Sequence, residues 1–422
     1  MFARSFPVGH AGALSLLLGS VCLPALTLPA LAFTSEGTAA GSQCIAVDVN
    51  DSKVVVGDCL DASGKLGAFV ASTAGMELPL APLVSNFNCF IGGLNNDPLS
   101  PKGIGSCQDA NHAGQAVVWA LSTPGALPLQ LQPLFLGNHA EAHAINTAGL
   151  VAGVSVNSNG DVSPAYWASG ATAAKALRSG SGLLSINNCS VSDINNGATP
   201  NTTSAVGHCR SSAGLPVAVL WPRLTLYAEP LTYPEYPESG GYFGDNCHVK
   251  QINLSGQMLG TCEFGQNEVR TVRWAAGGGS AVVLATVNGA AATHNSGVDM
   301  NDAGVVTGVY LSANSDFNQP YSWDPNTGTD AQSIPGPSRS NTGTPVAIGN
   351  NNRILLNFEL STGVTQASTY KPGGSLVADP PLDGGLSDVG VALSPNGCQA
   401  AGVSEGSNQA LTAVVENALS CP

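Results

Sequence analysis

Short apolar runs separated by polar turns alternate along the chain, and the arrangement repeats. Between His143 and Ser155, two apolar runs flank the turn Asn146-Thr147-Ala148-Gly149. An asparagine side chain can open a tight turn, and glycine can adopt the positive φ that closes it. Each such stretch predicts a β-hairpin.

The predicted hairpin recurs about eight times. Successive turns are 44 to 58 residues apart, and a period near 49 residues is typical of a stacked array or a propeller. The turn positions are Asn50, Asn95, Asn146, Asn195, Asn253, Asn301 and Asn350, with Ser394 in the eighth copy. A glycine follows seven residues later at Gly57, Gly153, Gly260 and Gly308, and later still at Gly105 and Gly207, where the turns are longer.

A third apolar run follows each hairpin and ends in an aromatic residue. All five tryptophans fall at this one position, with Tyr370 in the seventh copy and alanine (Ala71 and Ala413) in the first and eighth. A residue that recurs in every unit predicts packing between units, so we expect a buried core in preference to a sugar-stacking surface. The tryptophans are Trp119, Trp167, Trp221, Trp274 and Trp323.

A fourth apolar run completes most copies, for example at residues 78–83 and 127–135. Four strands in about 50 residues is the content of one propeller blade. We therefore predict an all-β propeller of eight four-stranded blades, with seven blades as the alternative. The eighth copy ends after three strands, and the residues after Phe33 are expected to supply the fourth and close the ring. The repeats span residues 44–83, 89–135, 140–182, 189–231, 247–287, 295–335, 344–381 and 388–422.

The cysteines provide a second measure of the register. In four copies one cysteine lies six residues before the turn position and a second lies after the turn. In the two copies without insertions the cysteines lie at positions −6 and +9 relative to the turn position. Residues that face each other across a hairpin have a constant sum of positions, and −6 + 9 equals the sum 0 + 3 of the residues that flank a two-residue turn. The two cysteines are therefore opposite each other, close enough for a disulfide. The same sum opposes a three-residue turn with a bulge, which would shift the register by one. The predicted pairs are Cys44–Cys59, Cys89–Cys107, Cys189–Cys209 and Cys247–Cys262, and the remaining Cys398 and Cys421 are paired with each other.

Residues 1–32 have the features of a secretory signal, with Arg4 at the start, an apolar stretch, and Ala30-Leu31-Ala32 as the cleavage site. Cleavage leaves 422 − 32 = 390 residues, 33–422, which we interpret as one domain with ten cysteines, an even number that favours a secreted or periplasmic location. No other segment reaches the ~20 apolar residues of a membrane span. A net charge of −14 disfavours nucleic acid as a partner.

The pattern A-x-x-I-N-x-x-G-x-V-x-G, followed by a short strand ending in tryptophan, resembles the HAF family of bacterial extracellular repeat proteins. The stretch from His143 to Ser155 is the closest copy, and Gly67-Ala68-Phe69-Val70 is nearest to the naming tripeptide His-Ala-Phe, which is absent. The resemblance implies an exported β-propeller-like protein of the envelope or extracellular space. It carries no catalytic residues, and the cysteine pairs depart from the family pattern.

Three groups of residues raise the question of chemistry. On a strand, His139, Glu141 and His143 would share one face and could hold zinc, although a solvated strand end is the simpler interpretation. The Asn/Asp-rich turns suggest calcium, but turn chemistry explains them without it. The stretch from Gly402 to Gly406 matches G-x-S-x-G but lies in the second arm of a predicted hairpin, not in a strand-to-helix elbow.

Two functions are consistent with these observations. The first is a non-enzymatic binding or scaffolding protein with a protein or glycan ligand, whose contact surface would be the insertions at residues 96–105 and 196–207. The second is a secreted hydrolase or lyase acting on glycans or esters in the channel. We assign no catalytic residue and no cofactor, because histidines and arginines are few and scattered. Six residues distinguish the two functions: His139, Glu141, His143, Asp193, His248 and His294. If three or more of them lie together in one pocket, an enzyme is favoured. If they are dispersed over separate blades, a binding protein is favoured.

Overall fold

The computed structural model describes residues 34–35, 43–71, 77–135, 137–180, 187–211, 214–236, 242–265, 268–292, 294–311, 317–337, 340–378, 387–405 and 411–416. All of them belong to one compact unit, Leu31–Pro422. The predicted signal peptide lies outside the described residues and stays a prediction.

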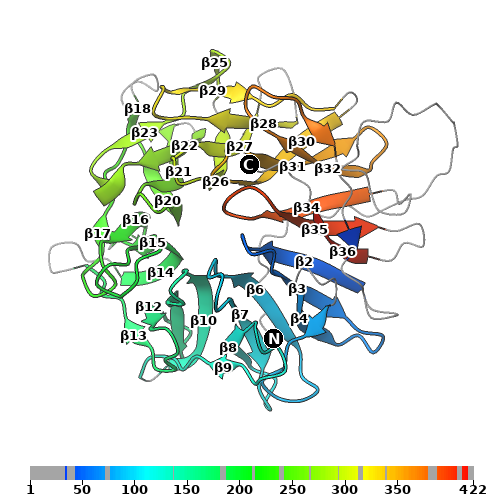
Figure 1. Cartoon of the computed structure of the whole chain (residues 1–422). Helices are drawn as coiled ribbons and strands as arrows, with labels where there is room; N and C mark the ends of the chain where they lie inside the picture. The colour runs from blue at the N-terminus through cyan, green and yellow to red at the C-terminus, as the bar shows by residue number, and fades with distance from the viewer. Residues whose placement is uncertain are drawn as a thin grey trace, which may run out of the picture. The chain divides into compact units, whose positions relative to one another are not determined.

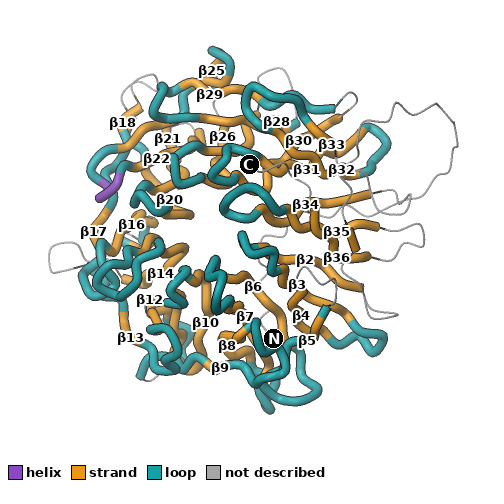
Figure 2. The backbone as a smooth tube through the Cα atoms, in the orientation of Figure 1, coloured by secondary structure: helices purple, strands orange, loops and turns teal. Residues whose placement is uncertain are grey.

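Eight antiparallel sheets follow one another in chain order around a ring and form an eight-bladed β-propeller (Figures 1 and 2). The first strand of a blade, such as β10 or β14, lies on the inner side of the ring, and the fourth, such as β13 or β17, lies on the outer side. Blades 1 to 4 are β2 (Gln43–Val49), β3 (Val55–Leu60), β4 (Leu66–Ala71), β5 (Leu78–Pro79); β6 (Cys89–Leu94), β7 (Lys102–Gln108), β8 (Gly114–Ala120), β9 (Leu129–Gln130); β10 (Gly137–Ile145), β11 (Val151–Asn157), β12 (Val162–Trp167), β13 (Lys175–Ala176); and β14 (Asn187–Ile194), β15 (Ala205–Arg210), β16 (Pro216–Trp221), β17 (Glu229–Pro230).

The second half of the chain repeats this plan with small additions. Blades 5 to 7 are β20 (Asp245–Ile252), β21 (Met258–Phe264), β22 (Glu268–Trp274), β23 (Ala281–Val283); β26 (Asn295–Met300), β27 (Val306–Leu311), β28 (Asn318–Trp323), β29 (Asp330–Ser333); and β30 (Ser340–Ile348), β31 (Ile354–Leu360), β32 (Thr365–Tyr370), β33 (Val377–Ala378). The additions are β24 (Thr286–Val287) and β25 (Ala290–Ala291) at the edge of blade 6, the hairpin of β18 (Glu235–Tyr236) and β19 (Tyr242–Phe243), and the 3₁₀ turn η3 (Ala276–Gly278).

The ring is closed by strands from both ends of the chain, as predicted. Blade 8 consists of β34 (Ser387–Leu393), β35 (Ala400–Glu405) and β36 (Leu411–Glu416), and its fourth strand is β1 (Thr34–Ser35). Thr34 pairs with Val415 in antiparallel register. The fourth strands are mostly shorter than the apolar runs that predicted them: β9 has two residues.

The four predicted hairpin disulfides are present: Cys44–Cys59, Cys89–Cys107, Cys189–Cys209 and Cys247–Cys262. Cys398 is also disulfide-bonded. Cys421 lies outside the described residues, so its pairing with Cys398 stays a prediction. Each described bridge joins the first and second strands of one blade, and closing a loop of this length contributes about 3 kcal/mol.

The prediction about the turn itself is wrong. In blade 1 the amide of Asn50 donates to the carbonyl of Val54 and the amide of Lys53 donates to that of Asn50, which defines a three-residue turn closed by Lys53 at φ 64°. This turn shifts the register by one. A bulge at Val47, between the pairs Ala46↔Gly57 and Asp48↔Val56, shifts it back. Because the two shifts cancel, the cysteines remain opposite each other.

The bulge occurs at the same place in the inner strand of all eight blades. The residue that pairs with the inner strand just before the bulge is a glycine in seven blades and Leu356 in blade 7. A Cβ on Gly153 would lie 2.0 Å from the carbonyl oxygen of Glu141, and one on Gly207 would lie 1.9 Å from that of Ser190. No side chain fits there without moving the inner strand.

The tryptophans form the core between blades, as predicted. All five are at most 1 % exposed. In the first four, the indole Nε1 donates to a backbone carbonyl just after the fourth strand of the preceding blade. Trp167, for example, donates to the carbonyl of Gln132 at 2.9 Å. Burial on this scale excludes the tryptophan row as a sugar-stacking surface.

Candidate binding site at the centre of the ring

A cavity of about 390 Å³ opens at the centre of the ring, at the end where the first and second strands of each blade are joined. Seven blades, 2 to 8, contribute lining residues, taken from the ends of the inner strands and from the turns. The wall is largely polar and holds carboxyl and amide groups of Asn96, Asp193, Asn196, Gln251, Asp299 and Asp302.

The turn asparagines do more than shape their own turns. The Oδ1 of Asn301 accepts the amides of Ala303 and Val305 in its own turn, at 3.1 and 3.0 Å. Its Nδ2 donates to the carbonyl of Gly349 in the next blade, at 3.1 Å. Corresponding donations to the next blade come from Asn50, Asn95, Asn146 and Asn253. In blade 7 the turn opens at Gly349 and not at the predicted Asn350, and the donation comes from Asn351 to the carbonyl of Gly397. The side chains therefore bind consecutive turns together around the cavity.

The acidic residues of the turns take part in the same links. Asp51 accepts the amide of Asn396 through Oδ1 and the Nδ2 of Asn96 through Oδ2, at 2.8 and 2.7 Å. Asp302 accepts the amide of Leu254 and the Nδ2 of Asn350, at 3.0 and 2.6 Å. These bonds join blade 1 to blades 8 and 2, and blade 6 to blades 5 and 7.

Three aspartates just after the bulge link the inner strands. Asp193 accepts the amide of Ile252 in the next blade at 2.9 Å. Asp48 and Asp299 likewise accept the amides of Leu94 and Ile348 in their next blades, at 2.9 and 2.7 Å. Burial raises the pKa of Asp193 to about 7, with a smaller contribution from the negative charge of Asp299, and raises that of Asp48 to about 6. Asp193 and Asp299 both line the cavity. Burial therefore raises the pKa of both of these cavity-lining carboxyl groups.

The two predicted insertions border this cavity. The first runs between Asn95 and Lys102 and the second between Asn195 and Ser204, each closed by an amide-to-carbonyl bond across its base. Asn96 and Asn196, the first residues of the insertions, are in the wall. Leu99 in the first loop is 91 % exposed.

The structure brings together the three residues predicted as a metal site. On β10 the carboxylate of Glu141 lies between two imidazoles, 3.5 Å from the Nε2 of His139 and 3.5 Å from the Nε2 of His143. The other ring nitrogen of His143, Nδ1, lies 2.7 Å from the carbonyl of Val191 in blade 4. Burial opposes the charged form of His143, but its bonds to Glu141 and Val191 outweigh burial and raise its pKa. Metal binding by this group stays a prediction.

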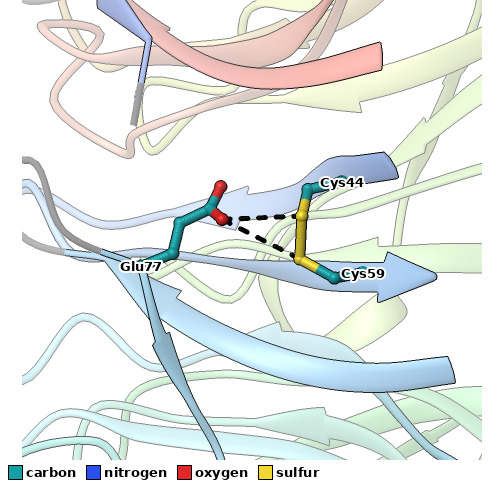
Figure 3. Close-up of side chains that lie close together, drawn as sticks. All are labelled: Cys44, Cys59 and Glu77. Carbon is teal, nitrogen blue, oxygen red and sulfur yellow. Dashed lines mark hydrogen bonds between the residues drawn. A yellow bond between two sulfur atoms is a disulfide. The ribbon is translucent and has the colours of Figure 1, made fainter. Parts of the chain in front are cut away.

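A different group meets a distance criterion for metal ligands. Among the described residues, Cys44, Cys59 and Glu77 are the one set of three potential ligand atoms within 4.8 Å of one another (Figure 3). The Oε2 of Glu77 lies 3.5 Å from the Sγ of Cys44 and 3.9 Å from that of Cys59. The sulfurs form a disulfide, and metals bind the thiolate form of cysteine. The oxidised pair is therefore a structural bridge.

The remaining candidates are separated. Of the six residues proposed as a test for an enzyme, Asp193 alone lines the central cavity. His248 lies on β20 of blade 5, and His294 precedes β26 of blade 6. Ser404 of the G-x-S-x-G match is buried on the antiparallel strand β35, where no nucleophile elbow exists.

Sequence reasoning missed the cavity-lining residues Gln251 and Asp299 and the contact of His208 with His248. One signal could have revealed Gln251, Asp299 and His248, although not His208, which follows its turn. The residues two, three and five places before the turn are ionisable in some copies and apolar in others, whereas the rest of the repeat is regular. Variation at a fixed position of a regular repeat indicates a role outside the core.

No family model and no curated protein matches this chain, so the resemblance to the HAF family stays a prediction. Among solved structures, the β-propeller domain of the Trilobed protease from Pyrococcus furiosus is similar with a TM-score of 0.49 and 8 % identity, over 78 % of this chain and 94 % of that one. A puromycin-hydrolyzing peptidase from Mycobacterium tuberculosis gives 0.44 and 13 %, over 92 % of this chain and 55 % of that one. The BP39L lectin from Burkholderia pseudomallei gives 0.37 and 10 %, over 90 % and 97 %. At these values the likenesses carry no functional argument.

The described part of the chain contains no helix with the length and apolar character needed to cross a bilayer.

Proposed function

We propose that this protein is an exported, non-enzymatic binding protein whose ligand occupies the central cavity. The observation that supports this most is a single polar cavity of about 390 Å³ to which seven blades contribute. Amide and carboxyl groups offer both donors and acceptors to hydroxyl groups, so a glycan is the ligand class that suits the wall. Four disulfides support an oxidising, extracytoplasmic location.

A hydrolase or lyase is the second candidate, because Asp193 and Asp299 both line the cavity and paired carboxyl groups serve acid–base catalysis. Their hydrogen bonds oppose this role. Each carboxyl group accepts one amide of its own strand and one of another blade. A group held by both oxygens supports the ring and is poorly placed to transfer a proton.

The test is a binding and turnover screen of residues 33–422 against neutral and acidic oligosaccharides. In the blocking variant, Leu254→Trp, a large ring is placed on a cavity-lining side chain that is 55 % exposed. Leu127→Trp, at a residue that is 76 % exposed and absent from the cavity wall, is the matched control.

We expect Leu254→Trp to weaken glycan binding at least tenfold and Leu127→Trp to leave it unchanged, with no product detected by mass spectrometry. Equal binding by both variants would place the site elsewhere. Turnover by the wild-type protein that Asp193→Asn abolishes would favour the hydrolase or lyase.

A further inference from the structure

A second, smaller cavity lies at the boundary between blades 2 and 3, and it shares no lining residue with the central cavity. Its volume is about 130 Å³, close to the roughly 150 Å³ of an apolar protein cavity that holds a benzene molecule. Apart from Lys102, its lining residues are apolar or glycine. The wall includes Val118, Leu129 and Leu131 of blade 2 and Val151, Trp167 and Ala171 of blade 3.

The cavity exists because two positions of the repeat carry small side chains at this boundary. The first is the residue before the tryptophan, which faces the next blade. In blades 3 and 4 this residue is Tyr166 or Leu220, and each is buried in the core cluster that it shares with the following blade. In blade 2 it is Val118, which is too small to fill the same space.

The second position lies two residues after the tryptophan. At the boundary between blades 1 and 2 it is Leu121, which packs in one core cluster with Val70, the counterpart of Val118. At the boundary between blades 2 and 3 it is Ser169, which is exposed. Neither blade therefore supplies the large side chain that fills the neighbouring boundaries.

The cavity extends from the surface to the core between the blades. Among its lining residues, Ala120 and Gly170 are exposed, whereas Leu131 and Trp167 are at most 1 % exposed. An apolar group that enters from the surface would leave water and contact the indole of Trp167. Removal of apolar surface from water is the main driving force for binding in such a site.

A positive charge lies beside the cavity. The Nζ of Lys102 in blade 2 donates to the Oγ of Ser169 in blade 3, at 2.8 Å. Gly149 leaves room for this contact, because a Cβ there would lie 2.7 Å from the Nζ and 2.8 Å from the Oγ. An ammonium group has three N–H donors, and the serine hydroxyl keeps its own hydrogen to donate. Both side chains can therefore donate to one anionic group.

We propose that this cavity is a second binding site, which takes an apolar ring or branched alkyl group that carries a carboxylate. The apolar group fills the cavity against Trp167, and the carboxylate accepts hydrogen bonds from Lys102 and Ser169. The ammonium group selects an acid over a neutral analogue, because hydrogen bonds between charged partners are stronger than those between neutral ones. This site goes beyond the proposed function, which concerns the central cavity.

The experiment uses residues 33–422 labelled with ¹⁵N at tryptophan and follows the indole Nε1–H signals during titration. The probes are phenylacetate and its neutral analogue phenylacetamide. We expect both to shift the signals of Trp119 and Trp167, which line the cavity, and to leave that of Trp323 in blade 6 unchanged. Phenylacetate should bind at least about threefold more tightly, a preference typical of a charge pair near the surface.

Variants connect the binding to the cavity. Val118→Tyr and Ser169→Leu each introduce the side chain that another boundary carries, so both should reduce the affinity for phenylacetate at least tenfold. Lys102→Met should reduce the affinity for phenylacetate to that for phenylacetamide. Lys175→Met, at an exposed residue of β13 outside the cavity wall, is the matched control and should change neither affinity. Thermal unfolding of each variant verifies that the ring is intact.

Two sources offer the proposed ligand chemistry, a free aromatic acid and the C-terminal phenylalanine of a polypeptide. The tripeptide glycyl-glycyl-phenylalanine separates them in the same titration. Tighter binding by phenylacetate identifies the free acid, and tighter binding by the tripeptide identifies the end of a chain.

Three results would overturn the inference. They are unchanged signals of Trp119 and Trp167 up to the solubility limit of phenylacetate, equal affinities of the wild-type protein for acid and amide, and an affinity for phenylacetate that survives in both filling variants. None of these results affects the proposed glycan site, and failure of the oligosaccharide screen would leave this second site standing.

Discussion

At the residue scale, the turn asparagine illustrates what the sequence reveals and what it hides. Its recurrence predicted the hairpins, because its Oδ1 bonds within its own turn are local. Its Nδ2 bond to the next blade was invisible, since the turn alone accounts for the residue. The glycine after the turn was equally visible, but the inner-strand carbonyl that lies close to it in blades 3 and 4 was not.

Asn301→Ala tests the link between blades. The change removes two bonds within the turn and the donations of Nδ2 to Gly349 and to the Oδ1 of Asn352 at 2.7 Å. We expect a loss of about 2–3 kcal/mol in the free energy of unfolding, since a buried hydrogen bond contributes about 1 kcal/mol. Asn157→Ala is the control, because the Oδ1 of Asn157 caps a turn in the same way while its Nδ2 donates to Asp161 in that same turn. Equal losses in urea titrations would show that the bond between blades contributes nothing.

At the element scale, strand number, blade number, ring closure and the four hairpin disulfides were predictable, whereas the turn type was not. The cysteine offsets report only the sum of the shifts along a hairpin. The three-residue turn shifts the pairing by one residue and the bulge shifts it back, so the two shifts cancel at the cysteines. The predicted register was therefore correct at the cysteines, although neither the turn nor the bulge was predicted. The residues at the bulge of blades 3 and 5 are His143 and Lys250, and their side chains contact backbone carbonyls of the next blade, those of Val191 and Val298.

The shared register allows one more hairpin bridge, in blade 3. Ala140 and Ser155 face each other as Cys44 and Cys59 do, with the same separation of 15 residues, and both are buried. Replacing both with cysteine should stabilise the oxidised protein by about 2 kcal/mol, from a loop term of about 3 kcal/mol less about 1 kcal/mol for the lost bond from Leu134 to the Ser155 hydroxyl. Thermal unfolding with and without reductant measures the gain. Ala140→Cys with Val154→Cys, one residue out of register, is the control that should not form the bridge.

At the scale of the whole molecule, the ring depends on buried carboxyl groups that link neighbouring blades. Asp58 accepts the amide of Ile91 at 2.9 Å, and Asp388 accepts that of Ala367 at 3.2 Å. The second oxygen of Asp388 is buried with no hydrogen-bond partner among the described residues. Burial raises the pKa of each to about 7. The sequence could not reveal this, because these aspartates lie within strands whose neighbours are fixed only when the ring closes.

These carboxyl groups determine how stability depends on pH. Since their pKa in the folded protein lies above the value near 4 of an unfolded chain, the folded state binds more protons between about pH 4 and pH 7, and stability falls as the pH rises through that window. Each group changes the free energy of unfolding by up to about 1.4 kcal/mol per pH unit there. We expect the melting temperature to be higher at pH 5 than at pH 8, and Asp58→Asn with Asp388→Asn to raise it at pH 8 and reduce the dependence. Asp61→Asn is the control: Asp61 is exposed and bonded to Ser63, which lowers its pKa, so its replacement should not raise the melting temperature at pH 8. A wild-type melting temperature that rises from pH 5 to pH 8 would show that these carboxyl groups are ionised at little cost inside the ring.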